Sequence, residues 1–358
     1  MLDGDTDDEE LLMLVCVTGG TGFVGSHTTA ALLAAGHRVR LLARRPEAVG
    51  AVLGPLGAGA AGVDVVPGDV TDAAAVDAAV RGTDAVLHAA SVYSFDPRRR
   101  AEIRRTNVRG TELVLDAARR HHVGRTVHVS SFGALLPAPE RFLREDAPVG
   151  RPREPYLASK AAAELVARQH QERGEPVVIT YPPGLHGPHD PRLGDQNRRL
   201  RDLLRGLMPI WPGGGFPIGD VRDTAAAHAT LISSPAAAAR QFTPGRYLTT
   251  REYLRAIRDA TGRALPAVFL PARAMMPVGR LADAVQRVVP WHIPAEFGAI
   301  YTCAHACWHR PAGDTAPRPL GETITDTVRW LHDRGAISGR AAGTTVRALP
   351  ENAARQVS

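Results

Sequence analysis

The sequence predicts an α/β protein with a doubly wound parallel sheet and a smaller, mixed C-terminal lobe. Apolar β-like runs alternate with helical patterns through the first half of the 358-residue chain, and the links between them are short. This order is typical of a parallel sheet with helices on both faces. The length suits about two domain-sized units, and the second lobe is expected to follow Pro188.

The first element is an apolar run over 14–17, which leads into the turn TGGTGFVG, a helical pattern ending at Gly36 and a second β-like run over 38–42. This unit has the glycine spacing of a Rossmann-type dinucleotide site. The first glycine allows the tight turn, the second lets backbone N–H groups approach a pyrophosphate, and the third permits close packing of helix on strand. The three glycines are Gly19, Gly22 and Gly25.

The end of the second β-like run indicates which dinucleotide is bound. An NAD site usually has Asp or Glu there, to accept hydrogen bonds from the ribose hydroxyls. This run ends in LLARRP, where Arg44 and Arg45 take that place, and guanidinium groups are suited to a 2′-phosphate. The sequence therefore predicts NADP(H) rather than NAD(H) as the cofactor.

Four further segments continue the alternation of strands and helices. Residues 63–72 are typical of a third strand, 84–91 of a fourth, 107–121 of a helix, and 125–135 of a fifth strand that runs into a serine pair. Together with the first unit they predict a Rossmann-type domain over residues 13–180.

The stretch YLASK contains the single lysine, Lys160, among the 43 Lys plus Arg residues. Tyr156 precedes it by four residues in a helical pattern, so both side chains are expected on one helix face. A free phenol has a pKa of about 10, and a neighbouring ammonium is expected to lower that pKa, which would let the tyrosine act as a general acid or base. An arginine at position 160 would bring a broad, planar guanidinium, which would not fit the space that the lysine ammonium is expected to occupy.

Eight motifs in series give the chain a resemblance to the extended short-chain dehydrogenase/reductases, which include the NAD-dependent epimerase/dehydratase family. They are TGGTGFVG, GDVTD, HAAS, NVRGT, VSSFGA, YLASK, YPPGLHGP and GDVRDTA, from residue 13 to about residue 230. Within this branch the chain is most similar to the dihydroflavonol-reductase and hydroxysteroid-dehydrogenase-like reductases. The resemblance implies that Ser131, Tyr156 and Lys160 are catalytic, with Ser131 preferred to Ser130, and that Lys160 also binds the nicotinamide ribose.

The resemblance also implies which residues contact the ligands. The expected cofactor contacts are Thr18, Gly19, Gly22, Phe23, Val24, Gly25, Arg44, Arg45, Asp69, Val70, Ala89, Ala90, Ser91, Asn107, Tyr156, Lys160 and Pro183. Of these, Asn107 is expected to fix the backbone around the cofactor rather than to touch substrate. Tyr93, Phe132 and His186 are expected at the substrate. Tyr181 replaces the arginine of the family's usual Arg-Pro pattern, so Tyr181 and His186 either line the pocket or replace packing groups.

The expected organisation has four parts. They are an acidic disordered tail over 1–12, the Rossmann domain over 13–180 with a returning segment at about 219–250, a substrate-binding lobe over 181–218 and 251–335, and a flexible tail over 336–358. Asp220 and Asp223 are interpreted as structural caps. The amphipathic stretch 276–289 is interpreted as an ordinary solvated helix face in preference to a membrane contact, because charged residues interrupt it.

Several classes of protein are disfavoured. The net charge is +6, but the arginines are scattered and the densest run lacks aromatic residues, so nucleic-acid binding is not expected. No metal site is expected, because CAHACWH has no second ligand pair of matching spacing. The run LLMLVCV is too short to span a membrane and follows acidic residues. A cytoplasmic enzyme is the default expectation, with a homodimer as the candidate assembly.

Three functions remain open. The first is an NADPH-dependent reductase that converts a ketone or aldehyde to an alcohol on a small, apolar or polyketide-like substrate. The second is a nucleotide-sugar epimerase or dehydratase that keeps NAD tightly bound. The third is a dinucleotide-binding protein without catalysis. The intact Ser–Tyr–Lys set disfavours the third, and Arg44 disfavours the second, although Arg192, Arg198, Arg199 and Arg201 are a candidate site for a sugar diphosphate.

Overall fold

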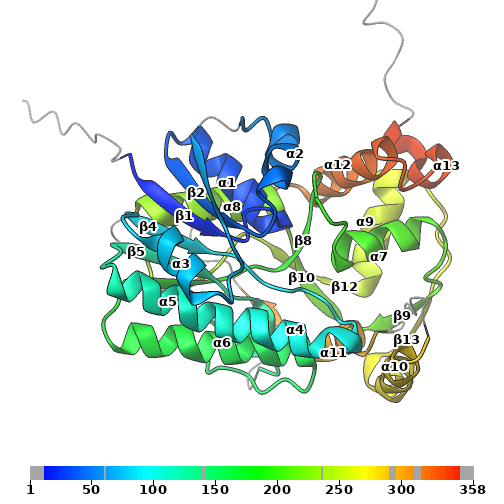
Figure 1. The fold of residues 1–358 in the computed structure, drawn as a ribbon. Helices are drawn as coiled ribbons and strands as arrows, with labels where there is room; N and C mark the ends of the chain where they lie inside the picture. The colour runs from blue at the N-terminus through cyan, green and yellow to red at the C-terminus, as the bar shows by residue number, and fades with distance from the viewer. Residues whose placement is uncertain are drawn as a thin grey trace, which may run out of the picture.

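The computed structural model describes residues 12–59, 62–138, 142–234, 237–289, 296–309 and 316–346. Its centre is a seven-stranded, all-parallel sheet with the order β11-β7-β5-β4-β1-β2-β3 (Figure 1). The strands are β1 (Leu14–Thr18), β2 (Arg38–Ala43), β3 (Val63–Pro67), β4 (Ala85–His88), β5 (Arg125–Val129), β7 (Val177–Tyr181) and β11 (Arg240–Phe242). The predicted doubly wound α/β fold is confirmed.

Helices cover both faces of this sheet (Figure 1). One face is packed by α1 (Phe23–Ala34) and α8 (Val221–Ser233), and the other by α3 (Ala73–Val80), α5 (Gly110–Arg120) and α6 (Pro155–Glu172). Strand β1 contains apolar residues at successive positions because both of its faces are buried. Val15 and Val17 enter the core beneath α1 and α8, while Cys16 enters the core beneath α3 and α5. A strand buried on both faces has no polar side.

The strand order reverses between β1 and β4, which positions the site. Ligands of open α/β sheets bind beyond the carboxyl ends of the strands at such a point. Here those ends are Thr18 and His88, which are paired in register, and their side chains share a hydrogen bond of 2.7 Å between Oγ1 and Nδ1. The glycine turn after β1 and the loop after β4 therefore lie side by side.

The second lobe has its own sheets and core. Strands β8 (Gly184–His186), β10 (Gly215–Asp220) and β12 (Arg246–Thr249) form one sheet, and β9 (Ile210–Gly213) pairs with β13 (Val268–Pro271). The helices of this lobe are α7 (Asp195–Leu204), α9 (Thr250–Thr261), α10 (Ala272–Gln286), α11 (Phe297–His305) and α12 (Leu320–Asp333). Leu200, Leu254 and Val328 meet in its apolar core.

Shorter elements complete the description. They are α2 (Val49–Leu53), α4 (Arg100–Arg104), β6 (Phe142–Leu143), which pairs with β14 (Trp308–His309), and α13 (Gly339–Ala342). Asp220 caps α8 by accepting a 2.8 Å hydrogen bond from the backbone N–H of Arg222. Asp223 instead accepts a 2.7 Å bond from the backbone N–H of Arg318, and so joins α8 to the segment before α12.

The C-terminal segment differs from the expectation of a flexible tail beginning at residue 336. Ile337, Ala341 and Ala342 are buried in the core of the second lobe, and Arg329 Nε donates a 2.9 Å hydrogen bond to the carbonyl oxygen of Thr345. The expectation was wrong for 336–346, because small residues there fill the space beside α9 and α12. Residues 347–358, and the expected acidic tail apart from Leu12, lie outside the described residues.

No helix within the described residues is long and apolar enough to cross a membrane.

Candidate active site

The glycine turn leaves no room for side chains at two of its three glycines. A Cβ on Gly19, whose φ is +78°, would lie 2.6 Å from the backbone nitrogen of Ala90. A Cβ on Gly25 would lie 2.2 Å from the carbonyl oxygen of Gly19. Helix α1 begins at Phe23, directly after the turn, so its first N–H groups point at the space beside the turn, where an anion is stabilised. Gly25 thus packs the helix onto the turn itself.

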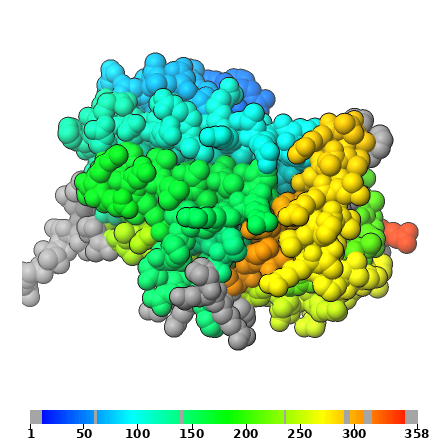
Figure 2. Space-filling view, turned by 90° about the horizontal axis from the view of Figure 1, so that it is seen from below, coloured from blue at the N-terminus to red at the C-terminus, as the bar shows by residue number. Residues whose placement is uncertain are grey.

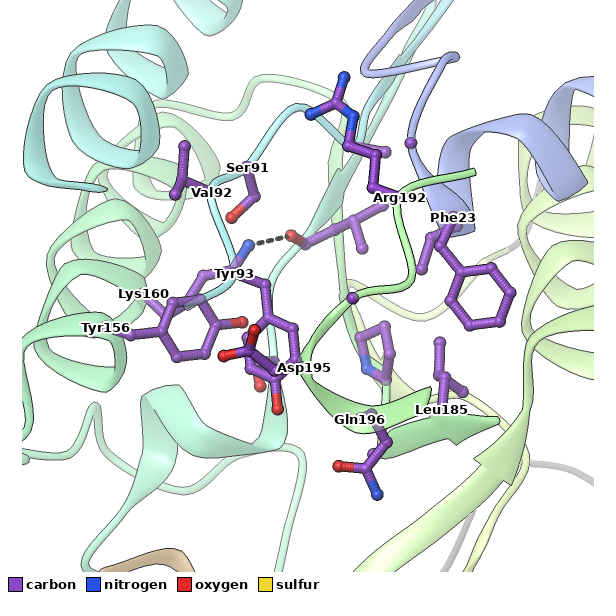
Figure 3. A pocket seen from close by; sticks show the side chains of 18 of the residues that line it. Phe23, Ser91, Val92, Tyr93, Tyr156, Lys160, Leu185, Arg192, Asp195 and Gln196 are labelled. Atoms are coloured by element: carbon purple, nitrogen blue, oxygen red, sulfur yellow. Dashed lines mark hydrogen bonds between the residues drawn. The ribbon is translucent and has the colours of Figure 1, made fainter. Parts of the chain in front are cut away.

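One cavity of about 490 Å³ runs from this turn into the second lobe. The predicted site residues that line it are Thr18, Gly19, Gly22, Phe23, Val24, Gly25, Arg44, Asp69, Val70, Ala89, Ala90, Ser91, Tyr93, Ser131, Phe132, Tyr156, Lys160 and Pro183. Three predicted site residues, Arg45, Asn107 and His186, are not among its lining residues. Figure 3 shows the side chains of Tyr93, Tyr156 and Lys160 on one wall, with those of Phe23, Leu185 and Arg192 on the other.

The predicted Ser–Tyr–Lys set comes together at the end of β5 and the start of α6. Glu154 caps α6: its carboxylate accepts hydrogen bonds from the backbone N–H groups of Tyr156 (3.0 Å) and Leu157 (2.8 Å). Ser131 accepts a 3.1 Å bond from the Gly133 N–H and lies close enough to the Tyr156 phenol to lower its pKa. The neighbouring serine, Ser130, has a buried hydroxyl with no hydrogen-bond partner in the structure.

The electrostatics of Tyr156 differ from the expectation. Burial raises the pKa of the Tyr156 phenol well above its usual range, with the nearby Tyr93 and Glu154 acting in the same direction, while the hydrogen bond from Ser131 lowers it. Burial lowers the pKa of Lys160 to about 8. The expected depression of the Tyr156 pKa by Lys160 is therefore outweighed by desolvation. A phenol in this site is protonated at neutral pH, the state that a proton donor needs.

Asn107 organises the site from outside the cavity. It lies in a π-helical turn, Arg105–Arg109, a feature that often accompanies functional sites. Its Oδ1 accepts hydrogen bonds from the Val92 N–H (2.7 Å) and the Ser91 hydroxyl (3.1 Å). Its Nδ2 donates to Ser159 Oγ on α6 at 2.9 Å. Asn107 thereby ties the loop after β4 to the helix that carries Tyr156 and Lys160.

Tyr181 and His186, for which two readings were open, are both packing residues in the structure. The Tyr181 hydroxyl donates a 2.6 Å hydrogen bond to Glu164 Oε1 and accepts one of 3.1 Å from Arg168. His186 is fully buried, and its ring nitrogens are within hydrogen-bond distance of Asn197 (2.9 Å) and the Tyr253 hydroxyl (2.8 Å). The structure does not support its expected contact with substrate, because His186 is not a lining residue of the cavity, whereas its partners Tyr253 and Gln196 are.

The end of the cavity beyond Tyr156 is aromatic and apolar, and the sequence patterns did not indicate most of its residues. They are Phe95, Met208, Trp211, Phe216, Tyr253, Ala299 and Cys303. Tyr93 packs edge-to-face on Tyr156 with 4.8 Å between ring centroids. These residues come from segments far apart in the sequence, so no local spacing marks them.

The arginines at this end are paired with acids. Arg199 Nε donates to Glu296 at 3.1 Å, and its guanidinium stacks over the Phe95 ring at 5.1 Å. Arg198 forms an ion pair with Asp195, and Arg201 forms one with Asp202 at 2.7 Å. Charge at the aromatic end is therefore largely compensated within the protein.

The opposite end is cationic. Arg44 at the end of β2, Arg99 before α4, and Arg192 in the loop between β8 and α7 all line the cavity. Burial lowers the pKa of Arg192, and the like charges of Arg44, Arg45 and Arg99 lower it further. Arg44 and Arg99 have exposed ion pairs, with Asp69 at 3.7 Å and with Glu102 at 2.9 Å, and such exposed pairs contribute little. Several guanidiniums thus converge on one space, which is the arrangement of an anion site.

The loop that carries Arg192 is held in an unusual conformation. His189 and Leu193 have φ values of 56° and 47°, in the left-handed region that non-glycine residues seldom adopt. The Asp190 carboxylate fixes the loop by accepting hydrogen bonds from the N–H groups of Arg192 (3.2 Å) and Gly194 (2.8 Å), and from Asn197 Nδ2 (3.1 Å). The second lobe thereby places a cation opposite Arg44.

These features fit a nicotinamide dinucleotide. The turn and the start of α1 suit a pyrophosphate, and the arginines suit a further phosphate. Tyr156, Lys160 and Ser131 lie between the cationic end and the aromatic end. Within the described residues, no group of three or more His, Cys, Asp or Glu side chains could hold a metal ion. The side chain of His309, part of the CAHACWH stretch, is outside the described residues.

Comparison with known proteins agrees with this reading. Residues 15–243 match the model of the NAD dependent epimerase/dehydratase family. The chain is 31% identical to sterol demethylase protein B of Methylococcus capsulatus, covering 91% of this chain and 100% of that protein. It is 29% identical to a 4-hydroxy-2-methyl-3-oxo-4-farnesyl-3,4-dihydroquinoline-1-oxide ketoreductase of Stigmatella aurantiaca, covering 95% and 100%. The solved dTDP-glucose 4,6-dehydratase of Streptomyces venezuelae, which has NAD bound, is 26% identical with a TM-score of 0.67 over 90% of this chain and 98% of that one.

Proposed function

Since the chain belongs to the NAD-dependent epimerase/dehydratase family, and is thus an NAD(P)-dependent oxidoreductase of the short-chain type, we propose that it is an NADPH-dependent carbonyl reductase. It converts a ketone or aldehyde on a small, apolar substrate to an alcohol. NADP(H) as the cofactor, and a cytoplasmic location with a homodimeric assembly, are parts of the same proposal.

The observation that carries the proposal is the division of the cavity into two ends of opposite character. The cationic end, with Arg44, Arg99 and Arg192, suits a cofactor that has one phosphate more than NAD. The aromatic end, with Trp211 and Phe216 among its lining residues, suits an apolar skeleton. Tyr156 and Lys160 lie between the two ends, where a carbonyl would meet both the cofactor and a proton donor.

The protein's own groups suit reduction. Because burial raises the pKa of Tyr156, its phenol stays protonated and can donate the proton to the carbonyl oxygen. Ser131 lines the cavity beside that phenol and lowers its pKa, so one oxygen can accept from both hydroxyls. The bound nicotinamide supplies the hydride. Lys160 holds a positive charge within the buried site, which stabilises the tyrosine after it has given up its proton.

The alternative function is that of a nucleotide-sugar epimerase or dehydratase, which the likeness to the dTDP-glucose dehydratase keeps in view. Such a substrate carries a diphosphate that needs cations near the sugar. Three of the four arginines that suggested this function, Arg198, Arg199 and Arg201, are paired with Asp195, Glu296 and Asp202. The fourth, Arg192, lines the cavity at its cationic end, where the proposal assigns it to the additional phosphate of NADP(H). The charge of the three paired arginines is already compensated, which favours an apolar substrate.

Two measurements on the purified protein test the proposal. We expect consumption of added NADPH, followed by absorbance, with a panel of aromatic and polycyclic ketones and aldehydes, and no consumption by a Tyr156→Phe variant. We also expect no stoichiometric nicotinamide in the supernatant after denaturation. Release of one NAD(H) per chain, together with no net turnover of added cofactor, would reverse the ranking of reductase and epimerase.

A further inference from the structure

Helix α10 of the second lobe exposes apolar side chains along its outer face. Ala272, Gly279 and Gln286, spaced seven residues apart, are buried and face α11. On the outside, Val278 is 57%, Leu281 66% and Val285 39% exposed. Val288, just past the end of the helix, is 83% exposed. A helix at the surface of a globular protein normally turns such a stripe toward the core.

The same surface continues onto the neighbouring strand pair. Val268 and Leu270 of β13 are 59% and 42% exposed, and Ile210, the partner of Val268 on β9, is 52% exposed. Figure 1 shows β9, β13 and α10 side by side at one edge of the molecule, and Figure 2 shows α10 as a projecting ridge. We define the outer stripe of α10 with these strand residues as the α10 surface. Contiguous exposed apolar surface of this kind marks a binding face.

A row of positive charges borders the stripe. Arg273, Arg280 and Arg287 are spaced seven residues apart, each directly after one of the buried positions, so they lie along one edge of the outer face. The Arg280 guanidinium stacks over the Phe297 ring of α11 at 5.2 Å, so Arg273 and Arg287 are the members of the row without such a contact to α11. Asp283 accepts a 3.2 Å hydrogen bond from the Phe297 N–H at the start of α11, and so belongs to the inner contact. Among the described residues of α10, the outer face is apolar with basic borders and carries no acid.

This combination of apolar side chains and arginines is that of a helix lying in the interface of a lipid bilayer. We infer that the α10 surface docks the protein peripherally on a membrane that contains anionic lipid. Apolar side chains enter the boundary between headgroups and acyl chains, and the arginines contact lipid phosphates. The structure thus favours the membrane contact over the ordinary solvated face that the charged residues had indicated.

A second copy of the chain fits this surface less well. A two-fold contact through the stripe would bring the two arginine rows near each other, and like charges repel. The area of its helical part is also small: a 15-residue helix is about 22 Å long, and at a width of about 10 Å it offers roughly 220 Å², against about 800 Å² per partner in a standard interface. Only the exposed side chains of Val268, Leu270 and Ile210 add to it. Peripheral binding to a lipid bilayer does not require an interface of that standard area.

The position of the α10 surface relative to the cavity suggests what membrane binding would do, and this step rests on the proposed function. The inner side of α10 packs on α11 through Met276 and Ile300, and α11 contributes Ala299 and Cys303 to the aromatic end of the cavity. A protein docked through α10 therefore holds the apolar end of its cavity close to the lipid, in which an apolar substrate dissolves.

Vesicle co-sedimentation of the full chain tests the inference without any assay of activity. The probes are phosphatidylcholine vesicles with and without phosphatidylserine. We expect the chain to sediment with the anionic vesicles and to be released by high salt. The double variant Leu281→Gln/Val285→Gln should lower the partition coefficient about tenfold or more. Arg273→Gln/Arg287→Gln should lower it about tenfold for anionic vesicles only.

The matched control is Leu165→Gln, because Leu165 is an apolar residue of α6 that is 51% exposed and lies outside the α10 surface. It should bind vesicles as the unchanged chain does. Circular dichroism melts verify that all variants fold. Absence of binding to anionic vesicles, or equal binding by the Leu281/Val285 variant, would overturn the inference. Sedimentation showing a dimer that this variant dissociates would overturn it as well, by assigning the surface to a second copy.

Discussion

The ammonium of Lys160 donates a 2.9 Å hydrogen bond to the carbonyl oxygen of Val129. Val129 is the last residue of β5, directly before the Ser130–Ser131 pair. The bond therefore joins the helix that carries Tyr156 to the strand that delivers Ser131. Lys160 is 5% exposed, so its head group occupies a closed space with a fixed partner.

Replacing Lys160 by arginine tests whether catalysis depends on the shape of this side chain or only on its positive charge. Lys160→Arg keeps a positive charge, but the guanidinium is broader than the ammonium and cannot take its place beside Val129 without displacing neighbours. We expect kcat for carbonyl reduction to fall by about 10²–10⁴-fold, the usual contribution of a general acid–base group. Stopped-flow or steady-state assays with NADPH measure it.

Tyr156→Phe should be as damaging as Lys160→Arg, and the double variant little worse than either, because the two residues act as a unit. Near-normal turnover by Lys160→Arg with a competent substrate would show that the single lysine has no special role.

The serine pair offers a matched comparison at adjacent positions. Ser131 contacts the Tyr156 phenol, whereas the buried Ser130 hydroxyl has no hydrogen-bond partner in the structure. Ser131→Ala should lower kcat by about tenfold or more, since one donor to the reacting oxygen is lost. Ser130→Ala should leave kcat within about twofold and should not lower the melting temperature, because no bond is broken. A larger loss of kcat in Ser130→Ala would exchange the two assignments.

Cofactor preference should depend on the cationic end of the cavity. Arg44→Ala and Arg192→Ala should each weaken NADPH binding by about ten- to a hundredfold, the worth of one charge-assisted contact. If the arginines bind the 2′-phosphate, the affinity for NADH should change little. Calorimetric titration with both cofactors measures this. The control is Arg109→Ala, which removes an exposed arginine paired with Glu112. Equal losses for NADH and NADPH would assign Arg192 to the pyrophosphate instead.

Glu154 should make the stability of the fold depend on pH. Burial raises the pKa of this carboxyl to about 7, against about 4.3 in an unfolded chain. Between these values the folded state binds more protons than the unfolded state, so the free energy of unfolding falls as the pH rises from about 4.5 to 7. The contribution is on the order of 4 kcal/mol at most.

The variant Glu154→Gln should remove this pH-dependent component. Its free energy of unfolding should therefore rise relative to that of the unchanged chain as the pH goes from 5 to about 8. Urea unfolding at several pH values gives the difference. A constant difference across this range would mean that the carboxylate ionises as readily in the folded state as in the unfolded one.

Tyr181 should matter for stability and not for catalysis. Its hydroxyl donates to Glu164, a fully buried carboxylate on α6 whose other oxygen has no hydrogen-bond partner in the structure. Tyr181→Phe removes a bond to a buried charge, which should cost about 1–3 kcal/mol of unfolding free energy. Denaturant unfolding measures this cost. The ratio kcat/KM should stay within about twofold, and a larger loss would return Tyr181 to the substrate pocket.

The sequence by itself determined the features that depend on local spacing. The glycine turn after β1 could be predicted because Gly19 and Gly25 meet each other within one turn of chain. Tyr156 and Lys160 could be placed together because four residues make about one turn of a helix. The alternation of apolar runs and helices predicted a parallel, doubly wound sheet, but the order of its seven strands appeared only in the structure.

Tertiary structure decided what depends on contacts between distant segments. His186 and Tyr181 carry no local sign of burial, and packing against Tyr253 and Glu164 alone makes them structural. The pairing of Arg199 with Glu296, 97 residues away, determines that one end of the cavity is nearly neutral.

The exposure of the outer face of α10 is the clearest example of a feature that only tertiary structure decides. Its spacing of apolar and charged residues defines two faces, but the sequence cannot say which face meets the protein. That choice depends on the surface that α11 offers: Gly279 lets the two helices approach closely, since a Cβ there would lie 3.0 Å from the Phe297 backbone. Ala272 and Gly279 therefore turn inward, and Val278, Leu281 and Val285 are left outside.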